Sequence, residues 1–95
     1  MKGEAIGLVE VRGFTAATKV ADIAAKTANI DILGYEVTNG SGHVVVKISG
    51  EVSAVTVAIE AVKAQGSESG IVVAMKVIAK PHDDLKKLLI DSNTN

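Results

Sequence analysis

Few features of this 95-residue chain suggest acid–base or metal chemistry. The two histidines, His43 and His82, have no second histidine at a spacing typical of a zinc site, and the chain contains no cysteine. The lack of cysteine also excludes disulfides, thiolate metal ligands and a cysteine nucleophile. We therefore interpret both histidines as surface or interface residues and expect neither a metal site nor a cofactor.

The same residues give no indication of an enzyme. Most of the serines fall in turns or polar loops, and no serine–histidine–acid arrangement can be recognised. Glu10 and the pair Asp83-Asp84 are far apart in the sequence. We interpret the first as a surface residue and the pair as a helix cap. The sequence therefore predicts no catalytic residue.

A glycine-rich stretch, Asn39-Gly40-Ser41-Gly42, has two interpretations. Such a stretch can cradle a phosphate, but it lacks the spacing of a P-loop and precedes a strand pattern rather than a helix. Asn-Gly accepts the positive φ angles of a tight turn. Taken alone, the stretch predicts a hairpin turn.

The elements around this turn follow from apolar periodicity and from the glycines, since Pro81 is the only proline. Alternation or runs of apolar residues predict strands, and a spacing of three to four predicts helices. The expected strands cover 4–12, 30–38, 43–49 and 70–79, and the expected helices cover about 15–28, 52–65 and 83–90. The order β-α-β-β-α-β with a short terminal helix predicts an α+β, ferredoxin-like fold. Its four-stranded antiparallel sheet would carry helices on one face.

Three details of these elements can be tested against a structure. Thr15 is expected to cap the first helix. Strand 43–49 alternates most cleanly, with one face made by Val44, Val46 and Ile48. The last strand is expected to place on one face Ile71, Val73, Met75 and Val77.

Composition and charge exclude several classes of protein. An apolar content of 47% and a net charge of −1 exclude intrinsic disorder. They leave more aliphatic surface than one small core covers, which favours self-association. The sequence lacks the stripe of basic and aromatic residues that is typical of nucleic-acid-binding proteins. No apolar run is long enough to span a membrane. Glu4 stands where a signal peptide would become apolar. We expect one cytoplasmic domain, residues 1–90, and a polar flexible tail, residues 91–95.

Five segments, in order from residue 4 to about 85, resemble the bacterial microcompartment shell proteins. They are residues 4–14 (EAIGLVEVRGF), 21–29 (ADIAAKTAN), 39–42 (NGSG), 50–52 (GEV) and 78–82 (IAKPH). The length resembles that of the single-domain, hexamer-forming members. Lys80 departs from the arginine that many members have, and lysine lacks the planar two-pronged contact of a guanidinium.

The resemblance implies a structural role. Six copies would form a hexagonal tile, and tiles would meet other shell proteins in a sheet that encloses enzymes in the bacterial cytoplasm. The family's glycine-rich pore loop matches Asn39, Gly40, Ser41 and Gly42. The tile-edge candidates are Lys26, Asn29, Lys80 and His82. Small polar metabolites would cross the pore, where Ser41 hydroxyls and nearby amides are expected to donate hydrogen bonds and to favour polar or anionic solutes.

Alternatives remain at three points. Lys26 follows Asp22 by four residues, so it is also a candidate for a solvated ion pair on a helix. The direction of the His43 side chain is open. The same fold order also occurs in ligand-sensing regulatory modules, in which the Gly-Ser-Gly turn would contact a small molecule.

Overall fold

The computed structural model describes residues 4–38, 40–66 and 70–79. Its elements are β1 (Glu4–Arg12), α1 (Phe14–Thr27), β2 (Asp31–Val37), β3 (His43–Glu51), α2 (Val52–Gly66) and β4 (Val72–Ala79). Each strand and helix expected within the described residues is present. Asn39, Lys80, His82, the expected helix 83–90 and the tail 91–95 lie outside them.

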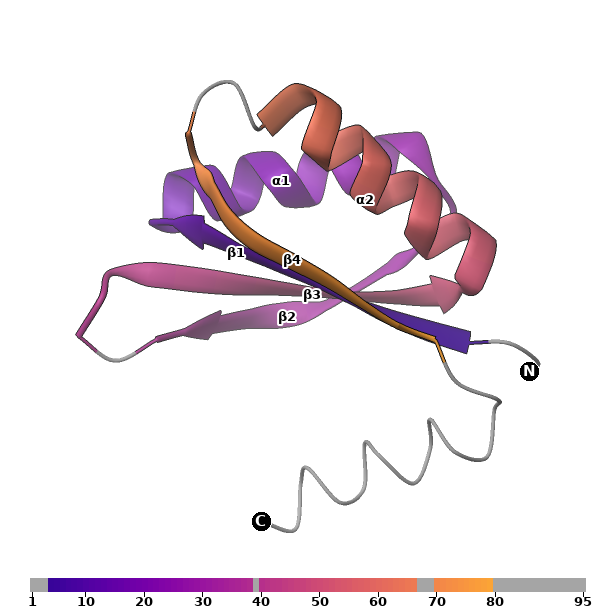
Figure 1. Ribbon diagram of the computed structural model, residues 1–95, viewed down its shortest axis with the longest axis horizontal. Helices are drawn as coiled ribbons and strands as arrows, with labels where there is room; N and C mark the ends of the chain where they lie inside the picture. The colour runs from indigo at the N-terminus through magenta and orange to yellow at the C-terminus, as the bar shows by residue number, and fades with distance from the viewer. Residues whose placement is uncertain (1–3, 39, 67–69, 80–95) are drawn as a thin grey trace, which may run out of the picture.

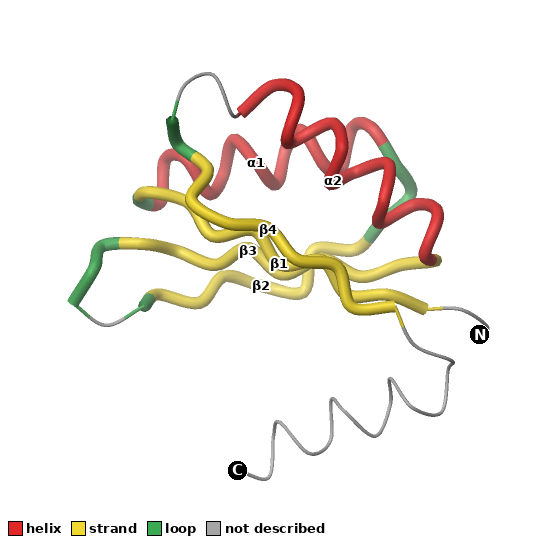
Figure 2. The backbone as a smooth tube through the Cα atoms, viewed as in Figure 1, coloured by secondary structure: helices red, strands yellow, loops and turns green. Residues whose placement is uncertain are grey.

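The four strands form one sheet in the order β2-β3-β1-β4, and every neighbouring pair is antiparallel. Both helices cover the same face of this sheet, and the hairpin that joins β2 to β3 projects from one end (Figure 1). Figure 2 shows the resulting two layers, with helices above the strands. The prediction of an α+β, ferredoxin-like arrangement is confirmed.

The core lies between the helices and the covered face of the sheet. Alternation in β3 sends Val44, Val46 and Ile48 into it, as predicted, and β1 adds Val9 and Val11. α1 contributes mainly small residues, which allow a helix to approach the strands closely. Its buried residues are Ala16, Ala17, Val20, Ala21 and Ala24. From α2 come Val55, Ala58, Ile59 and Val62. Removing this aliphatic surface from water is the main stabilising contribution.

Two predicted details are wrong. Thr15 does not cap α1, because the helix already begins at Phe14 with Gly13 at its N-cap and no side-chain cap bond. The second error concerns β4, where the register against β1 shifts at Glu10 and Val11. This bulge pairs Val72 with Val11 and leaves Val73 39% exposed. Met75, by contrast, packs against the core as expected.

Gly7 sits where α2 presses on the centre of the sheet. It lies opposite Ile48 in the β1–β3 register. A Cβ atom at this position would be 2.8 Å from Cγ1 of Ile48 and 3.1 Å from Cγ1 of Val55. Both neighbours are fully buried, so neither has room to move away. Glycine here sets the separation of α2 from the sheet.

Gly7→Ala should therefore reduce the free energy of unfolding by roughly 1–3 kcal/mol, the usual cost of overpacking a core. Denaturant unfolding followed by circular dichroism measures the change. Ser53→Thr adds a methyl group at an exposed position of α2 and should change stability by less than about 0.5 kcal/mol. Equal stability of Gly7→Ala and the unaltered chain would contradict this account of the packing.

Candidate functional site

The loop between β2 and β3 is the first part of the candidate site. The backbone N–H of Thr38 donates to the carbonyl of His43 at 3.0 Å and closes the loop at its base. Gly40 and Gly42 have φ angles of 78° and 74°, a region that side chains with a Cβ rarely adopt. The predicted hairpin turn is thus present, and glycine is required at both positions. Ser41, between them, is exposed.

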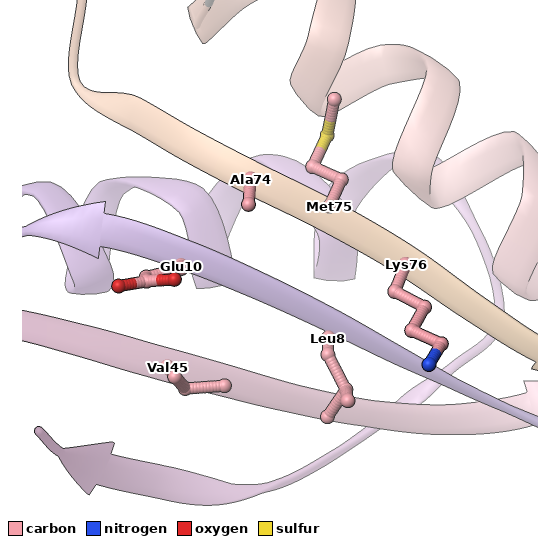
Figure 3. Close-up of a pocket in the computed structure, with 6 residues that line it drawn as sticks. All are labelled: Leu8, Glu10, Val45, Ala74, Met75 and Lys76. Atoms are coloured by element: carbon pink, nitrogen blue, oxygen red, sulfur yellow. The ribbon is translucent and has the colours of Figure 1, made fainter.

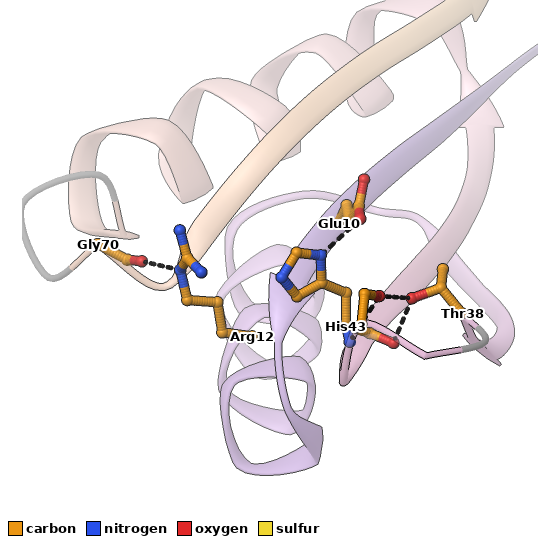
Figure 4. A network of polar contacts seen from close by, with 6 residues as sticks. Glu10, Arg12, Thr38, His43 and Gly70 are labelled. Carbon is orange, nitrogen blue, oxygen red and sulfur yellow. Dashed lines mark hydrogen bonds and ion pairs between the residues drawn. The ribbon is translucent and has the colours of Figure 1, made fainter.

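Side-chain hydroxyls form a small network inside this loop. Oγ of Ser41 lies 2.5 Å from Oγ1 of Thr38, and the Thr38 hydroxyl also donates to the carbonyl of His43 at 3.1 Å. The backbone N–H of His43 donates to Oγ of Ser41 at 3.3 Å. Figure 4 shows these contacts at the base of the loop. Sequence reasoning missed Thr38, although a threonine beside an Asn-Gly turn often bonds to nearby backbone.

The ring of His43 points away from the helices and binds Glu10. Nδ1 of His43 lies 2.8 Å from Oε2 of Glu10, and both side chains are partly buried. The register explains the contact: β1 and β3 pair Arg12 with His43 and Glu10 with Val45, so Glu10 is a diagonal neighbour on the open face. Sequence reasoning gave Glu10 no partner. The contact fixes the direction of His43, which had been open.

Arg12 holds the neighbouring end of β4. Its backbone N–H donates to the carbonyl of Ile71 at 3.0 Å. Its Nε donates to the carbonyl of Gly70 at 3.1 Å (Figure 4). The His43–Glu10 pair and the Arg12 contacts together tie the start of β3, the end of β1 and the start of β4 at one end of the sheet.

A second charged pair lies on the open face beside the hairpin. Nζ of Lys47 is 2.6 Å from Oε1 of Glu36. The hydrogen bond from Lys47, and then its positive charge, hold the pKa of Glu36 below its ordinary value. The Glu36 side chain is 62% exposed, so salt will screen the attraction.

The open face also carries a shallow hollow of about 310 Å³, lined by Leu8, Glu10, Val45, Ala74, Met75 and Lys76. Figure 3 shows that the Met75 side chain turns instead toward α2. The lining contains no nucleophile beside a base. Throughout the described residues, no group of three histidine, cysteine or acidic side chains is arranged to hold a metal ion. The hollow therefore offers apolar contact with two charges at its borders, and no reaction follows from it.

The described edge candidates lie at the opposite end of the molecule from the hairpin. Lys26 is in the last turn of α1, and Asn29 follows that helix as an exposed residue. Nζ of Lys26 is 3.1 Å from Oδ2 of Asp22, and the Lys26 side chain is 76% exposed. Figure 1 shows the hairpin at one extreme of the structure and the end of α1 toward the other. The ion-pair interpretation of Lys26 is thus confirmed, while the lysine remains accessible.

Both outer strands of the sheet expose apolar side chains. On β2 they are Leu33, Tyr35 and Val37, which are 43–57% exposed. Phe14 extends this patch, since its ring centroid lies 6.2 Å from that of Tyr35. The β4 edge exposes Val73 and Val77. Within the part of the chain that the structure describes, no helix has the length and apolarity needed to cross a membrane.

Comparison with known proteins gives consistent matches. The family model of the BMC domain matches residues 5–81. Bacterial microcompartment shell protein PduA of Citrobacter freundii is 45% identical over 89 residues, or 94% of this chain and 95% of PduA. Carboxysome shell protein CcmK2 of Thermosynechococcus vestitus is 38% identical over 87 residues, or 90% of this chain and 84% of CcmK2.

A solved structure has the same fold. The crystal structure of a microcompartments protein from Desulfitobacterium hafniense DCB matches with a TM-score of 0.68 and 32% sequence identity. The match covers 79% of this chain and 40% of that protein.

The His43–Glu10 contact predicts an unusual tautomer. A carboxylate only accepts hydrogen bonds, so Nδ1 must carry the proton and Nε2 must be bare when the ring is neutral. Nitrogen chemical shifts of neutral His43 should therefore show the Nδ1–H form. In Glu10→Leu the Nε2–H form should gain population, whereas Glu51→Leu, an exposed acid at the far end of β3, should have no effect. A dominant Nε2–H form in the unaltered chain would refute the contact.

The Lys47–Glu36 pair predicts a titration and a pH dependence. The carboxyl pKa of Glu36, followed by NMR, should lie below its ordinary value and return toward it in Lys47→Met or in high salt. Because the folded-state pKa is lowered, the pair stabilises the fold above the unfolded-state pKa of Glu36 and loses this effect as pH falls through the lowered value. Lys63→Met, which removes a charge from α2, should leave this titration unchanged. An unaltered Glu36 pKa in Lys47→Met would contradict the pairing.

Proposed function

This chain belongs to the BMC domain family of bacterial microcompartment shell proteins, and from that premise we propose that it forms hexameric tiles with a central pore made by the loop 39–42. The tiles join edge to edge in a shell within the bacterial cytoplasm. Small polar metabolites cross the shell through the pores. The role is structural, and the reactions belong to the enclosed enzymes.

The placement of the two candidate regions carries this proposal. The hairpin loop and the end of α1 lie at opposite extremes of the molecule (Figure 1). A subunit that directs its loop at a sixfold axis therefore directs Lys26 and Asn29 outward to the rim. One orientation of the subunit thus serves both the pore and the tile edge.

The two apolar sheet edges support a closed ring. A ring of identical copies needs two different surfaces on each copy, one for each neighbour. The exposed patch on β2, which includes Tyr35 and Val37, and the exposed valines of β4 lie on the two opposite edges of the sheet. Pairing of such edges around a ring would remove this surface from water. The proposed ring therefore accounts for the aliphatic excess of the sequence, because neighbouring copies would bury the exposed apolar residues of β2 and β4.

The loop itself suits a narrow constriction. Gly40 and Gly42 have no side chains that would collide when several copies of the loop converge. Ser41, between them, has a small polar side chain. The loop residues carry no formal charge. Asn39, outside the described residues, remains part of the proposed lining. Such a constriction admits small polar molecules and excludes bulky apolar ones.

At the tile edge, Lys26 provides the proposed contact with a neighbouring tile. Its aliphatic stem can lie along the neighbour while the ammonium group meets carbonyl oxygens. The pair with Asp22 is exposed and therefore weak, so Lys26 can exchange it for a new partner. Asn29, Lys80 and His82 remain predicted edge residues. Tiles of other shell proteins would meet this one along the same rim.

Two substitutions should separate the ring from the sheet. Lys26→Ala should leave hexamers intact in a mass measurement and reduce the extended sheets seen by electron microscopy. Val37→Asp, which places a charge in the exposed β2 patch, should instead yield monomers or small oligomers. Loss of the hexamer in Lys26→Ala would show that the lysine is misplaced. A stable monomer of the unaltered chain with tight, saturable binding of a metabolite would favour a ligand-sensing module instead.

A further inference from the structure

We propose that Thr38 sets the chemical preference of the pore by accepting the hydrogen bond that the Ser41 hydroxyl donates. Ser41 then presents a hydrogen-bond acceptor, and the loop favours solutes that donate hydrogen bonds, such as polyols and ammonium compounds. This inference rests on the proposed function of the loop as a pore.

The argument follows the three protons of the loop network. A carbonyl oxygen cannot donate, so the 3.1 Å contact uses the single hydroxyl proton of Thr38 to bind the carbonyl of His43. The 2.5 Å contact between the two hydroxyls therefore needs the proton of Ser41. The third proton, on the backbone nitrogen of His43, points to Oγ of Ser41 at 3.3 Å.

The result is a closed chain of hydrogen bonds that starts at the N–H of His43 and ends at its own carbonyl. Each hydroxyl both accepts and donates, and such chains reinforce one another's polarity. The Ser41 hydroxyl donates its proton to Oγ1 of Thr38 and accepts the N–H of His43 with one lone pair. A single lone pair remains, and Ser41 is exposed while Thr38 and His43 are half-buried. The group that Ser41 offers to a solute is consequently an acceptor.

This changes the expectation drawn from sequence. A free serine hydroxyl would turn its proton toward an anion, and six of them would favour anionic solutes. Because the Ser41 proton is in the hydrogen bond to Thr38, Oγ of Ser41 has no free proton to donate to an anion. A solute hydroxyl or ammonium group finds a partner without breaking the network. The residue that decides this preference is Thr38, although Ser41 is the one that meets the solute.

Planar bilayers that contain the hexamer test the idea with methylammonium formate, which pairs a small donor cation with a small acceptor anion. The reversal potential in a concentration gradient gives the permeability ratio of the two ions. Thr38→Val keeps the shape and the backbone bond to His43 but frees the Ser41 proton. It should shift the ratio toward formate by roughly 2- to 10-fold, the factor that one hydrogen bond supplies.

Two matched variants make the result specific. Thr38→Ser restores the accepting hydroxyl and should return the ratio to that of the unaltered chain. In a Ser41→Ala background, Thr38→Val should have no further effect, because the proton that it frees is absent. An unchanged ratio in Thr38→Val, or the same shift without Ser41, would overturn the role of Thr38.

The loop network can also be tested without transport. If hexamers of the unaltered chain form but conduct neither ion, the proposed pore fails, and NMR then decides on the network alone. A Ser41 hydroxyl proton that exchanges slowly with water, and exchanges fast in Thr38→Val, supports the hydrogen-bond assignment. Fast exchange in both forms overturns it.

Discussion

The antiparallel register between β1 and β3 is the constraint on which the rest of the structure depends. These two strands form the centre of the sheet. Pairing Gly7 with Ile48 gives α2 room to approach, and pairing Arg12 with His43 brings the imidazole to Glu10. A slip of one residue would turn the core valines to the open face and His43 into the core. The same register thus determines both the stability of the fold and the geometry at the base of the hairpin.

The proposed assembly would cover apolar surface that the isolated fold leaves exposed. The helices cover one face of the sheet, but Tyr35 and Val37 on β2 and Val73 on β4 remain substantially exposed. In a protein that acted alone, such outer strands would invite aggregation. In the proposed closed ring each sheet edge would contact the opposite edge of the next copy, and strand pairing would stop when the ring closed. The apolar excess is therefore consistent with a chain whose native form includes its neighbours.

Local patterns in the sequence predict the elements well, but contacts between distant elements decide what the patterns miss. Alternation over 43–49 and the glycines at 40 and 42 locate the hairpin, because both signals are local. The side-chain direction at Val73 depends on how β1 pairs with β4, which no local pattern contains. The Glu10–His43 contact likewise needs the register. The family resemblance predicted the pore and edge residues, and the segments that carry it do not include Thr38.

The chemistry of a pore need not be set at its narrowest point. Ser41 projects from a turn that two glycines make possible, yet its side chain is hydrogen-bonded to Thr38 and to the backbone of His43. His43 is in turn held through its ring by Glu10, on a strand buried in the middle of the sheet. The orientation of the exposed Ser41 hydroxyl thus depends on contacts that lead through His43 to the central strand β1. In the proposed pore, substitution at position 38 would change the hydrogen-bonding group that Ser41 presents to a solute and would leave both glycines unchanged.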